Sequence, residues 1–308
     1  MKFRSGALCL KHELIGSKEL VGKYFKFKFE NHLYEGFGND DFELIIECVT
    51  EEKAQQAYEL FISALTLLDS HVNYSLNELP SVVSYSLNQL KPGNTLYHKN
   101  IQQFSRLGIY KAAQIATKAS FRKIHTNSIY KYLFACSQHS NYPIHLDPFS
   151  TSYQKLSRNP LDHLRYSYAI LALYSIIEEL GLEIRASQKK PSKLNGNWNL
   201  EVKNDLQERL IKSKVDIQKK AYWNLRSKPT KVHPQSKLQL VDKALWSKEY
   251  VRDSTIEIID AISYSSWLRS KIIAHKLNDD FLSISIYDVA NVNFLVRQIL
   301  LDIFKADN

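Results

Sequence analysis

The sequence predicts a mainly helical protein, in which a C-terminal helical bundle follows a small α+β domain. Three observations support this: strand-like alternation near the N-terminus only, helical periodicity through most of the remainder, and a chain long enough for two cores. The 308 residues are 44% hydrophobic and 24% charged, an ordinary globular composition. We expect a small α+β domain at residues 1–95, a helical connector at 96–119 and a helical domain at 120–308.

The N-terminal domain is expected to contain two strands followed by a helix. Tyr24–Glu30 alternates aromatic and charged residues, and Phe42–Val49 is largely apolar. The turn-rich stretch between them favours a hairpin or neighbouring strands. Thr50 is expected to cap a helix whose first turn holds Glu51 and Glu52, because the helix dipole favours acidic residues there.

Helices are expected to dominate after the chain break at Lys91–Asn94. They are predicted at Gln102–Arg122, Asn127–Ser137, Pro160–Gly181, Leu200–Asn224 and Tyr250–His275, with a last helix from about Asp288. The helix that begins at Pro160 is predicted to bury one stripe of residues: Leu164, Tyr168, Leu171, Ser175, Glu178 and Leu182.

Positive charge is concentrated between Arg185 and Tyr250. This segment has 16 Lys and Arg against 6 Asp and Glu, whereas the whole chain has a net charge of +9. A basic insertion of this kind suits a phosphate backbone, although a solvated lysine-rich surface has the same composition. We therefore expect a basic insertion at residues 185–250 within the helical domain.

Features of export, membrane insertion and metal binding are not evident. The N-terminus lacks the apolar run of a secretory signal, and no stretch of about 18 uncharged apolar residues is present. The cysteines Cys9, Cys48 and Cys136 are isolated, which argues against a zinc finger and a disulfide framework. His145 and Asp147 suggest a metal ligand pair, but no third ligand is suitably spaced. These features predict a cytoplasmic protein without a metal or other cofactor and without membrane contact.

One predicted helical segment, Ser266–Lys276, places an arginine and a histidine beside a buried stripe. In an α-helix Arg269 and His275 would flank Ile272 at roughly 60° to either side, about 9 Å apart along the axis. An arginine on an apolar stripe is costly unless it pairs with a carboxylate, such as Glu178, or faces a second chain.

Spacing alone does not single out this pair. Two other pairs, Arg158/His163 and Arg226/His233, have similar spacing. The first pair straddles a proline at a helix start, and the second lies in a proline-containing loop. Only the pair in Ser266–Lys276 lies within a continuous apolar-striped helix that is followed by a further helix.

The segment Leu268–His275, LRSKIIAH, resembles the R-x(4–6)-H signature of HEPN domains, whose members often read close to LRNKIAH. The resemblance extends from about Ser120 to the C-terminus and includes the long helix around Tyr168–Glu178. It implies a HEPN-type helical bundle and a metal-independent endoribonuclease. It also implies a homodimer in which the two motif helices form a composite cleft. Ser270 departs from the family pattern, which commonly has Asn, Asp or His there.

The resemblance assigns catalysis to Arg269 and His275. RNA supplies its own nucleophile, the ribose 2′-OH, and an imidazole with an ordinary pKa of about 6.5 exchanges protons at neutral pH. Arginine presents a bidentate fork to the phosphate, and a neighbouring arginine favours neutral imidazole. The expected products are a 2′,3′-cyclic phosphate and a 5′-OH. Four further residues are expected to assist, two as supports and two as RNA contacts: Ser270 and Glu178, and Lys271 and Lys276.

HEPN nucleases commonly serve in bacterial toxin–antitoxin and phage-defence systems. The resemblance therefore implies RNA as the substrate, with an antitoxin or a phage-derived trigger as a further partner. Two alternatives stay open: a non-catalytic HEPN-fold module that binds RNA or neutralises a toxin, and a helical interaction protein in which the motif is accidental. Ser270 favours the first alternative, whereas the presence of both Arg269 and His275 opposes it.

Overall fold

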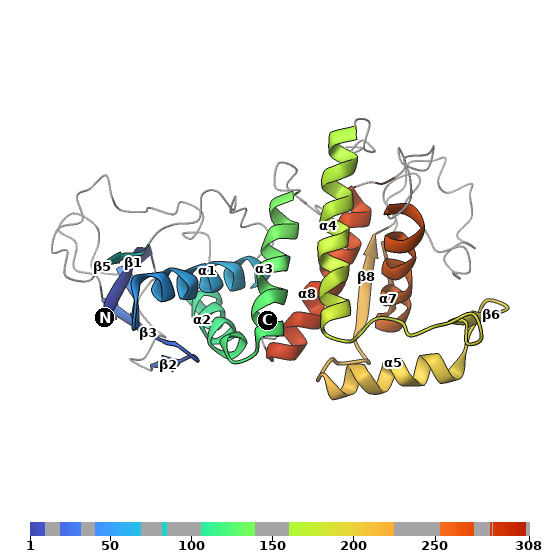
Figure 1. The fold of residues 1–308 in the computed structure, drawn as a ribbon, viewed down its shortest axis with the longest axis horizontal. Helices are drawn as coiled ribbons and strands as arrows, with labels where there is room; N and C mark the ends of the chain where they lie inside the picture. Colours follow the sequence, from blue (N-terminus) through green and yellow to red (C-terminus); the bar gives the residue numbers. More distant parts are fainter. Residues whose placement is uncertain are drawn as a thin grey trace. The chain divides into compact units, whose positions relative to one another are not determined.

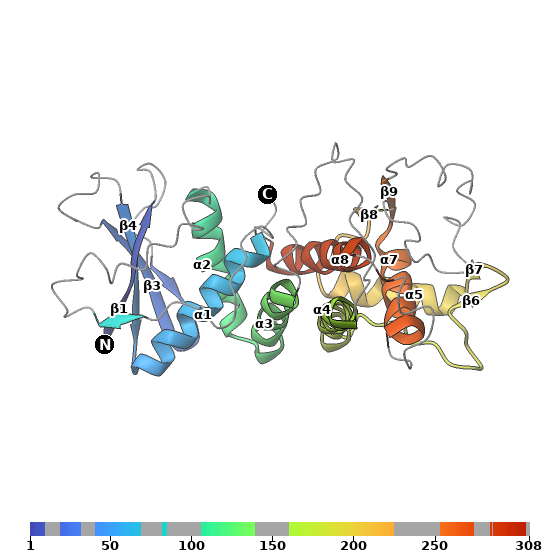
Figure 2. The ribbon, with the colours of Figure 1, turned by 90° about the horizontal axis from the view of Figure 1, so that it is seen from above.

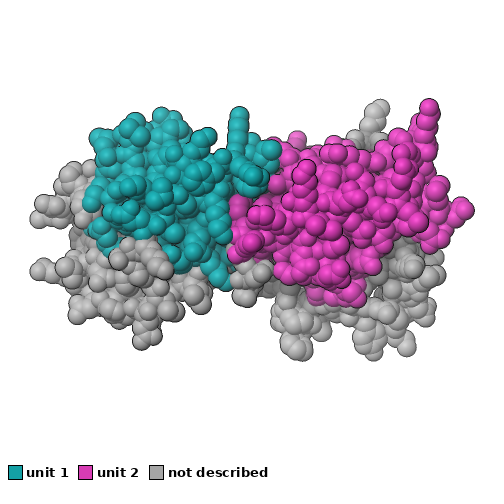
Figure 3. Space-filling view, turned by 90° about the horizontal axis from the view of Figure 1, so that it is seen from below, with its two compact units in different colours: residues 1–140 teal, residues 141–308 magenta. Residues whose placement is uncertain are grey.

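A computed structural model describes residues 1–9, 19–31, 41–68, 82–84, 106–138, 160–224, 253–273, 284 and 286–305 of the chain. Within these residues the protein is mainly helical, with a small sheet near the N-terminus (Figure 1, Figure 2). The chain divides into two compact units, unit 1 at residues 1–140 and unit 2 at residues 141–308 (Figure 3). The predicted boundary at residue 120 falls inside unit 1, between its helices α2 and α3.

Unit 1 contains a five-stranded antiparallel sheet with the strand order β2-β3-β4-β1-β5. The strands are β1 (Lys2–Cys9), β2 (Leu20–Val21), β3 (Phe25–Asn31), β4 (Asp41–Cys48) and β5 (Val83–Ser84). The strands predicted at residues 24–30 and 42–49 are confirmed as β3 and β4, which pair directly. Phe25, Phe27 and Phe29 are all buried, as the alternating pattern predicts.

Helix α1 (Glu51–Leu68) packs on the apolar face of this sheet. Phe61 of α1 meets Phe27 of β3, with ring centroids 6.1 Å apart. The predicted cap is confirmed, because Oγ1 of Thr50 accepts a hydrogen bond from the backbone N–H of Lys53 at 3.2 Å. Local capping chemistry therefore fixes where α1 begins.

Helices α2 (Arg106–Ser120) and α3 (Lys123–Gln138) are joined by a tight turn and both pack against α1 (Figure 2). The sequence predicted both helices, but it placed the start of the second at Asn127. The observed start is four residues earlier. Both residues of the turn, Phe121 and Arg122, are exposed.

Unit 2 contains four α-helices, a π-helical segment and two small antiparallel ladders among its described residues. The helices are α4 (Pro160–Glu179), α5 (Leu200–Lys212), α7 (Ile258–Trp267), the π-helix η4 (Leu268–Ile273) and α8 (Ile286–Phe304). The ladders are β6 (Lys193–Leu194) with β7 (Asn197–Trp198), and β8 (Lys220–Asn224) with β9 (Asp253–Glu257). Helix α8 is buried along most of its length and packs against α4, α7 and β8.

Two predicted helices, Leu200–Asn224 and Tyr250–His275, are wrong over part of their length because each contains a strand. Helix α5 ends where Lys214 adopts a left-handed backbone conformation with φ of 66°, and β8 follows. Strand β9 precedes α7, and Ala221 of β8 lies opposite Ile256 of β9. Strand formation here depends on a partner distant in the sequence, which local periodicity does not reveal.

The buried face of α4 also differs from the predicted stripe. Leu164, Tyr168 and Glu178 are exposed, although the stripe included all three. The residues that are buried instead are His163, Tyr166, Ser167, Ala169, Ile170, Leu173, Tyr174, Ile176 and Ile177. Because α4 carries apolar residues on nearly every side, its periodicity does not determine which side packs.

The β6–β7 hairpin fastens the basic insertion to helix α7. Its turn at residues 195–196 is an Asn-Gly pair with positive φ at both positions, which suits a two-residue hairpin. The side chain of Lys193 is only 4% exposed, lies over the rings of Trp198 and Tyr264, and pairs with Asp260 at 3.6 Å. Nε1 of Trp198 donates a hydrogen bond to Asp260 at 2.9 Å. The insertion is therefore part of the core packing around α7.

Replacing Lys193 by methionine is expected to lower the free energy of unfolding by about 1–2 kcal/mol. The substitution keeps an unbranched apolar side chain but removes the ammonium group from between two rings. Lys190→Met is the matched control, because the ion pair of Lys190 with Glu201 is exposed on both sides and should contribute no more than about 0.5 kcal/mol. Urea titration followed by circular dichroism measures both values, and equal losses would contradict the anchoring role.

Candidate ribonuclease site

The predicted catalytic arginine lies in a π-helical segment. Helix α7 ends at Trp267, and the chain continues as η4, which contains Arg269 and Ser270. Such segments are rare and occur frequently at functional sites. His275 and Lys276 lie outside the described residues, as does the side chain of Lys271.

The π-helix changes the geometry predicted for the motif. Its i→i+5 hydrogen bonds widen each turn, so successive residues no longer advance by the α-helical angle. The α-helical angle predicted between Arg269 and Ile272 therefore does not apply, because both residues lie in the π-helix; the predicted position of His275 lies outside the described residues. No sequence pattern in LRSKII distinguishes a π-turn from an α-turn.

Glu178 of α4 contacts Arg269 across the helix pair. Nη2 of Arg269 lies 3.3 Å from Oε1 of Glu178, and the two side chains are 42% and 39% exposed. Two interpretations of this contact follow from the sequence: Glu178 supports the catalytic site, or it forms an ordinary salt bridge with Arg269. A guanidinium group has five N–H donors, so one such contact leaves donors that can reach a phosphate.

A second polar contact joins the same helices one turn away. Tyr174, four residues before Glu178, is buried, and its hydroxyl interacts electrostatically with Ser266, three residues before Arg269. Burial raises the pKa of Tyr174, the nearby Ser266 hydroxyl lowers that pKa, and Glu178 and Arg269 shift it in opposite directions. The phenol is therefore neutral at neutral pH. Neither Tyr174 nor Ser266 was predicted to belong to the site, although the i, i+4 spacing of Tyr174 and Glu178 was a usable signal.

Tyr174→Phe is expected to lower the free energy of unfolding by about 0.5–1.5 kcal/mol. The change removes only the hydroxyl that contacts Ser266, and it should also speed hydrogen exchange of the amides in α7 and η4. Tyr168→Phe is the matched control on the same helix, because the Tyr168 side chain is exposed. This variant should lower the free energy of unfolding by no more than about 0.5 kcal/mol. Faster exchange in both variants, or in neither, would contradict a role for Tyr174 in fixing these helices.

Ser270, predicted to support the pair, uses its hydroxyl within its own helix. Its Oγ donates to the carbonyl oxygen of Trp267 at 3.4 Å. Serine hydroxyls that bond back to the preceding turn commonly accompany bent or irregular helices. The described contact of Ser270 therefore stabilises the local backbone around Arg269 and does not involve the guanidinium group.

In the described part of the basic segment, many cations are neutralised by nearby carboxylates. Six basic side chains between Arg185 and Asn224 form ion pairs: Arg185–Glu183, Lys190–Glu201, Lys193–Asp260, Lys203–Glu257, Arg209–Asp205 and Lys219–Asp302. Several exposed lysines, among them Lys189 and Lys212, have no such ion pair with a described carboxylate. The described part of this segment is thus less electropositive than its composition suggests.

Across the described part of the chain, no group of three or more His, Cys, Asp or Glu is arranged to hold a metal ion. His145 and Asp147 lie outside the described residues. None of the described helices has the length and apolar character needed to cross a membrane.

Comparison with known proteins finds no matching family model, no similar curated protein and no similar solved structure. Any function for this fold must therefore be argued from the residues themselves, above all from the contacts around Arg269.

Proposed function

We propose that the protein is a metal-independent endoribonuclease of the HEPN type, in which Arg269 and His275 promote cleavage of RNA. The observation that carries the proposal is the environment of Arg269. This side chain lies in a π-helical turn, is partly exposed, and is held by Glu178 of the neighbouring helix. A partly exposed guanidinium group that a carboxylate orients keeps further N–H donors with which it can bind a phosphate.

In the proposed reaction the ribose 2′-oxygen attacks the adjacent phosphorus while its proton passes to the imidazole of His275. The bond between phosphorus and the 5′-oxygen breaks, and that oxygen takes up a proton. Arg269 holds the non-bridging oxygens as negative charge develops on them. The products are a 2′,3′-cyclic phosphate and a 5′-OH, and no cofactor takes part.

The neighbouring side chains have supporting roles in this proposal. Glu178 restricts the long Arg269 side chain to one region, which reduces the entropy lost when it binds phosphate. Tyr174 and Ser266 fix the helix that carries Arg269. Lys271 and Lys276 would contact the RNA backbone.

In this proposal the protein acts in the cytoplasm as a homodimer, and the two copies are joined through the segments that contain Arg269. Helix α4, which contacts η4, exposes three apolar side chains, Leu161, Leu164 and Tyr168. A second copy covering this stripe would remove it from water, which favours association.

As a toxin or phage-defence effector, the dimer would be restrained by an antitoxin or activated by a phage-derived trigger.

A non-catalytic HEPN-fold module that binds RNA or neutralises a toxin is the second candidate. Two contacts favour it: the Glu178–Arg269 ion pair satisfies the arginine without RNA, and Ser270 is engaged with the backbone of Trp267. In this case the same surface would bind its partner without cutting it.

Incubation of total RNA with the purified full-length protein in EDTA tests the proposal. The expected result is fragmentation on a gel by the wild type and intact RNA with the His275→Ala variant. RNA binding without fragmentation would favour the non-catalytic module. If the protein neither binds nor fragments RNA, the Arg–His spacing is accidental.

A further inference from the structure

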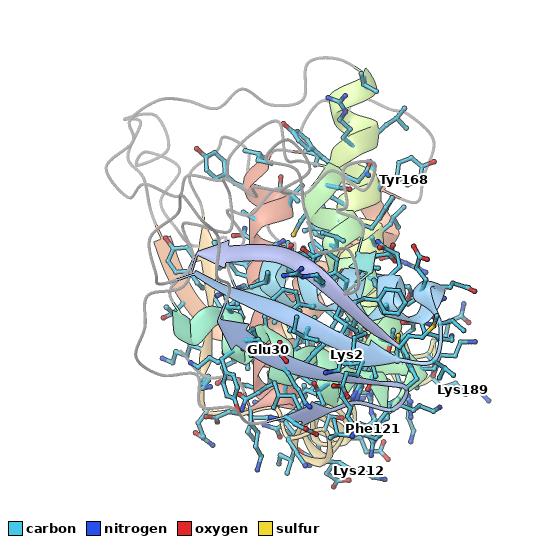
Figure 4. The ribbon with its side chains drawn as sticks, turned by 90° about the vertical axis from the view of Figure 1, so that its left-hand side faces the viewer. Lys2, Glu30, Phe121, Tyr168, Lys189 and Lys212 are labelled. Carbon is cyan, nitrogen blue, oxygen red and sulfur yellow. The ribbon has the colours of Figure 1, made fainter. Side chains whose placement is uncertain are left out.

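The turn between α2 and α3 in unit 1 presents an aromatic ring among exposed cations. Phe121 is 56% exposed, and its neighbours Arg122, Lys123 and Ile124 are exposed as well. Lys118, one helical turn before Phe121, is also exposed. We call these five residues the α2–α3 patch; Phe121 is labelled in Figure 4.

The patch lies in a part of the chain that has no acidic residue. Residues 79–146 contain eight Lys and Arg and neither Asp nor Glu, and six of the eight lie between Arg106 and Gln138. No ion pair joins Arg122 or Lys123 to a carboxylate in the described part of the chain. This differs from the segment after Arg185, where most described cations are paired.

Hydrogen bonds hold the turn in one conformation. The carbonyl oxygen of Ala119 accepts from the backbone N–H of Arg122 at 3.1 Å and from Oγ1 of Thr126 at 3.0 Å. Oγ of Ser120 accepts from the backbone N–H of Lys23 at 2.9 Å, which ties the turn to the edge of the sheet. A preorganised surface loses little conformational entropy when it binds a ligand.

The position of the cations on α3 also points to an anionic partner. Arg122 and Lys123 lie at the start of the helix, where the dipole disfavours positive side chains and favours anions. In α1, by contrast, the first turn holds Glu51 and Glu52. The arrangement on α3 is unfavourable for the isolated helix, and a bound polyanion would make it favourable.

We propose that the α2–α3 patch docks single-stranded RNA, with phosphates at Lys118, Arg122 and Lys123 and an unstacked base on the ring of Phe121. Single strands are bound by such combinations of cations and aromatic faces. Within the α2–α3 patch only Phe121 and Ile124 expose apolar side chains, which is little apolar surface for insertion into a membrane. The inference rests on the proposed function for the choice of RNA, and it places a substrate-binding surface in the unit that does not contain Arg269.

Fluorescence anisotropy with a labelled 2′-O-methyl RNA of about 20 nucleotides tests the patch on the full chain. This RNA has no free 2′-OH, so its binding is measured independently of cleavage and of whether the proposed catalysis is correct. Arg122→Gln/Lys123→Gln is expected to weaken binding and to reduce the log–log salt slope by about 1.4, roughly 0.7 for each lost phosphate contact. Phe121→Leu should weaken binding roughly 5- to 100-fold with little change in slope.

Lys189→Gln/Lys212→Gln is the matched control, because it removes the same charge from exposed positions in unit 2 (Figure 4). Its dissociation constant and salt slope should stay close to those of the wild type. The proposal is overturned if the control weakens binding as much as the Arg122/Lys123 variant, or if both patch variants bind like the wild type. It is also overturned if the patch is needed for binding to anionic phospholipid vesicles but not to RNA.

Discussion

Alanine in place of Arg269 or His275 is expected to lower the rate of RNA cleavage by about 10²–10⁴-fold. His275→Ala removes the group that exchanges protons with the 2′-OH. Arg269→Ala removes the fork that stabilises charge on the phosphate, and Arg269→Lys should recover only part of the rate because lysine keeps the charge without the bidentate geometry. Initial rates on a fluorescent RNA in EDTA give these values.

Arg165 provides a matched control for Arg269. It lies on α4 in the same unit, is partly exposed, and has no ion pair with a described residue. Arg165→Ala should therefore cleave at close to the wild-type rate. A rate loss equal to that of Arg269→Ala would mean that general positive charge matters, and full activity of Arg269→Ala would remove the arginine from the mechanism.

Trp223→Ala is expected to lower the free energy of unfolding by about 3–5 kcal/mol. Trp223 in β8 is fully buried and is among the largest buried side chains of the described residues. Its ring meets that of Tyr264 on α7 edge to face, with centroids 5.6 Å apart. Its removal would leave a cavity beside the helix that leads into Arg269. Urea unfolding monitored by circular dichroism measures the loss.

Trp223→Phe distinguishes packing from hydrogen bonding at this position. Nε1 of Trp223 is buried and has no hydrogen-bond partner in the described structure. Phenylalanine keeps an aromatic ring and removes the unsatisfied donor, whose burial is unfavourable. The loss should therefore be much smaller than that of Trp223→Ala. Equal losses would mean that the indole N–H has a partner.

The sequence predicted those elements whose signals are local. Thr50 with the acidic residues after it placed the start of α1, Pro160 placed the start of α4, and alternation identified β3. It did not predict β8 and β9, because these two strands stabilise each other and lie far apart in the sequence.

The candidate site was predictable only in part. The Glu178–Arg269 contact was suggested by placing both residues on buried stripes; the contact forms, although both side chains are partly exposed. The interaction between Tyr174 and Ser266 depends on which side of α4 packs, and the apolar pattern of that helix leaves this undetermined. The π-helix was not predictable either, because no residue type in Leu268–Ile273 distinguishes it from an α-helix.

The α2–α3 patch was missed for a different reason. Outside residues 185–250 the net charge is close to zero, because acidic stretches elsewhere cancel the acid-free segment at residues 79–146. The acid-free segment is visible in the sequence itself, whereas the pairing of cations with carboxylates from Arg185 onward is visible only in the structure.

Cleavage of a short RNA and of its 2′-O-methyl counterpart in EDTA tests the central claim most directly. If Arg269 and His275 promote attack by the ribose 2′-OH, the wild type cuts the RNA and leaves a 2′,3′-cyclic phosphate, while the methylated strand stays intact. Cleavage of both strands at the same rate, or an RNA that stays intact with the wild type, would contradict the account.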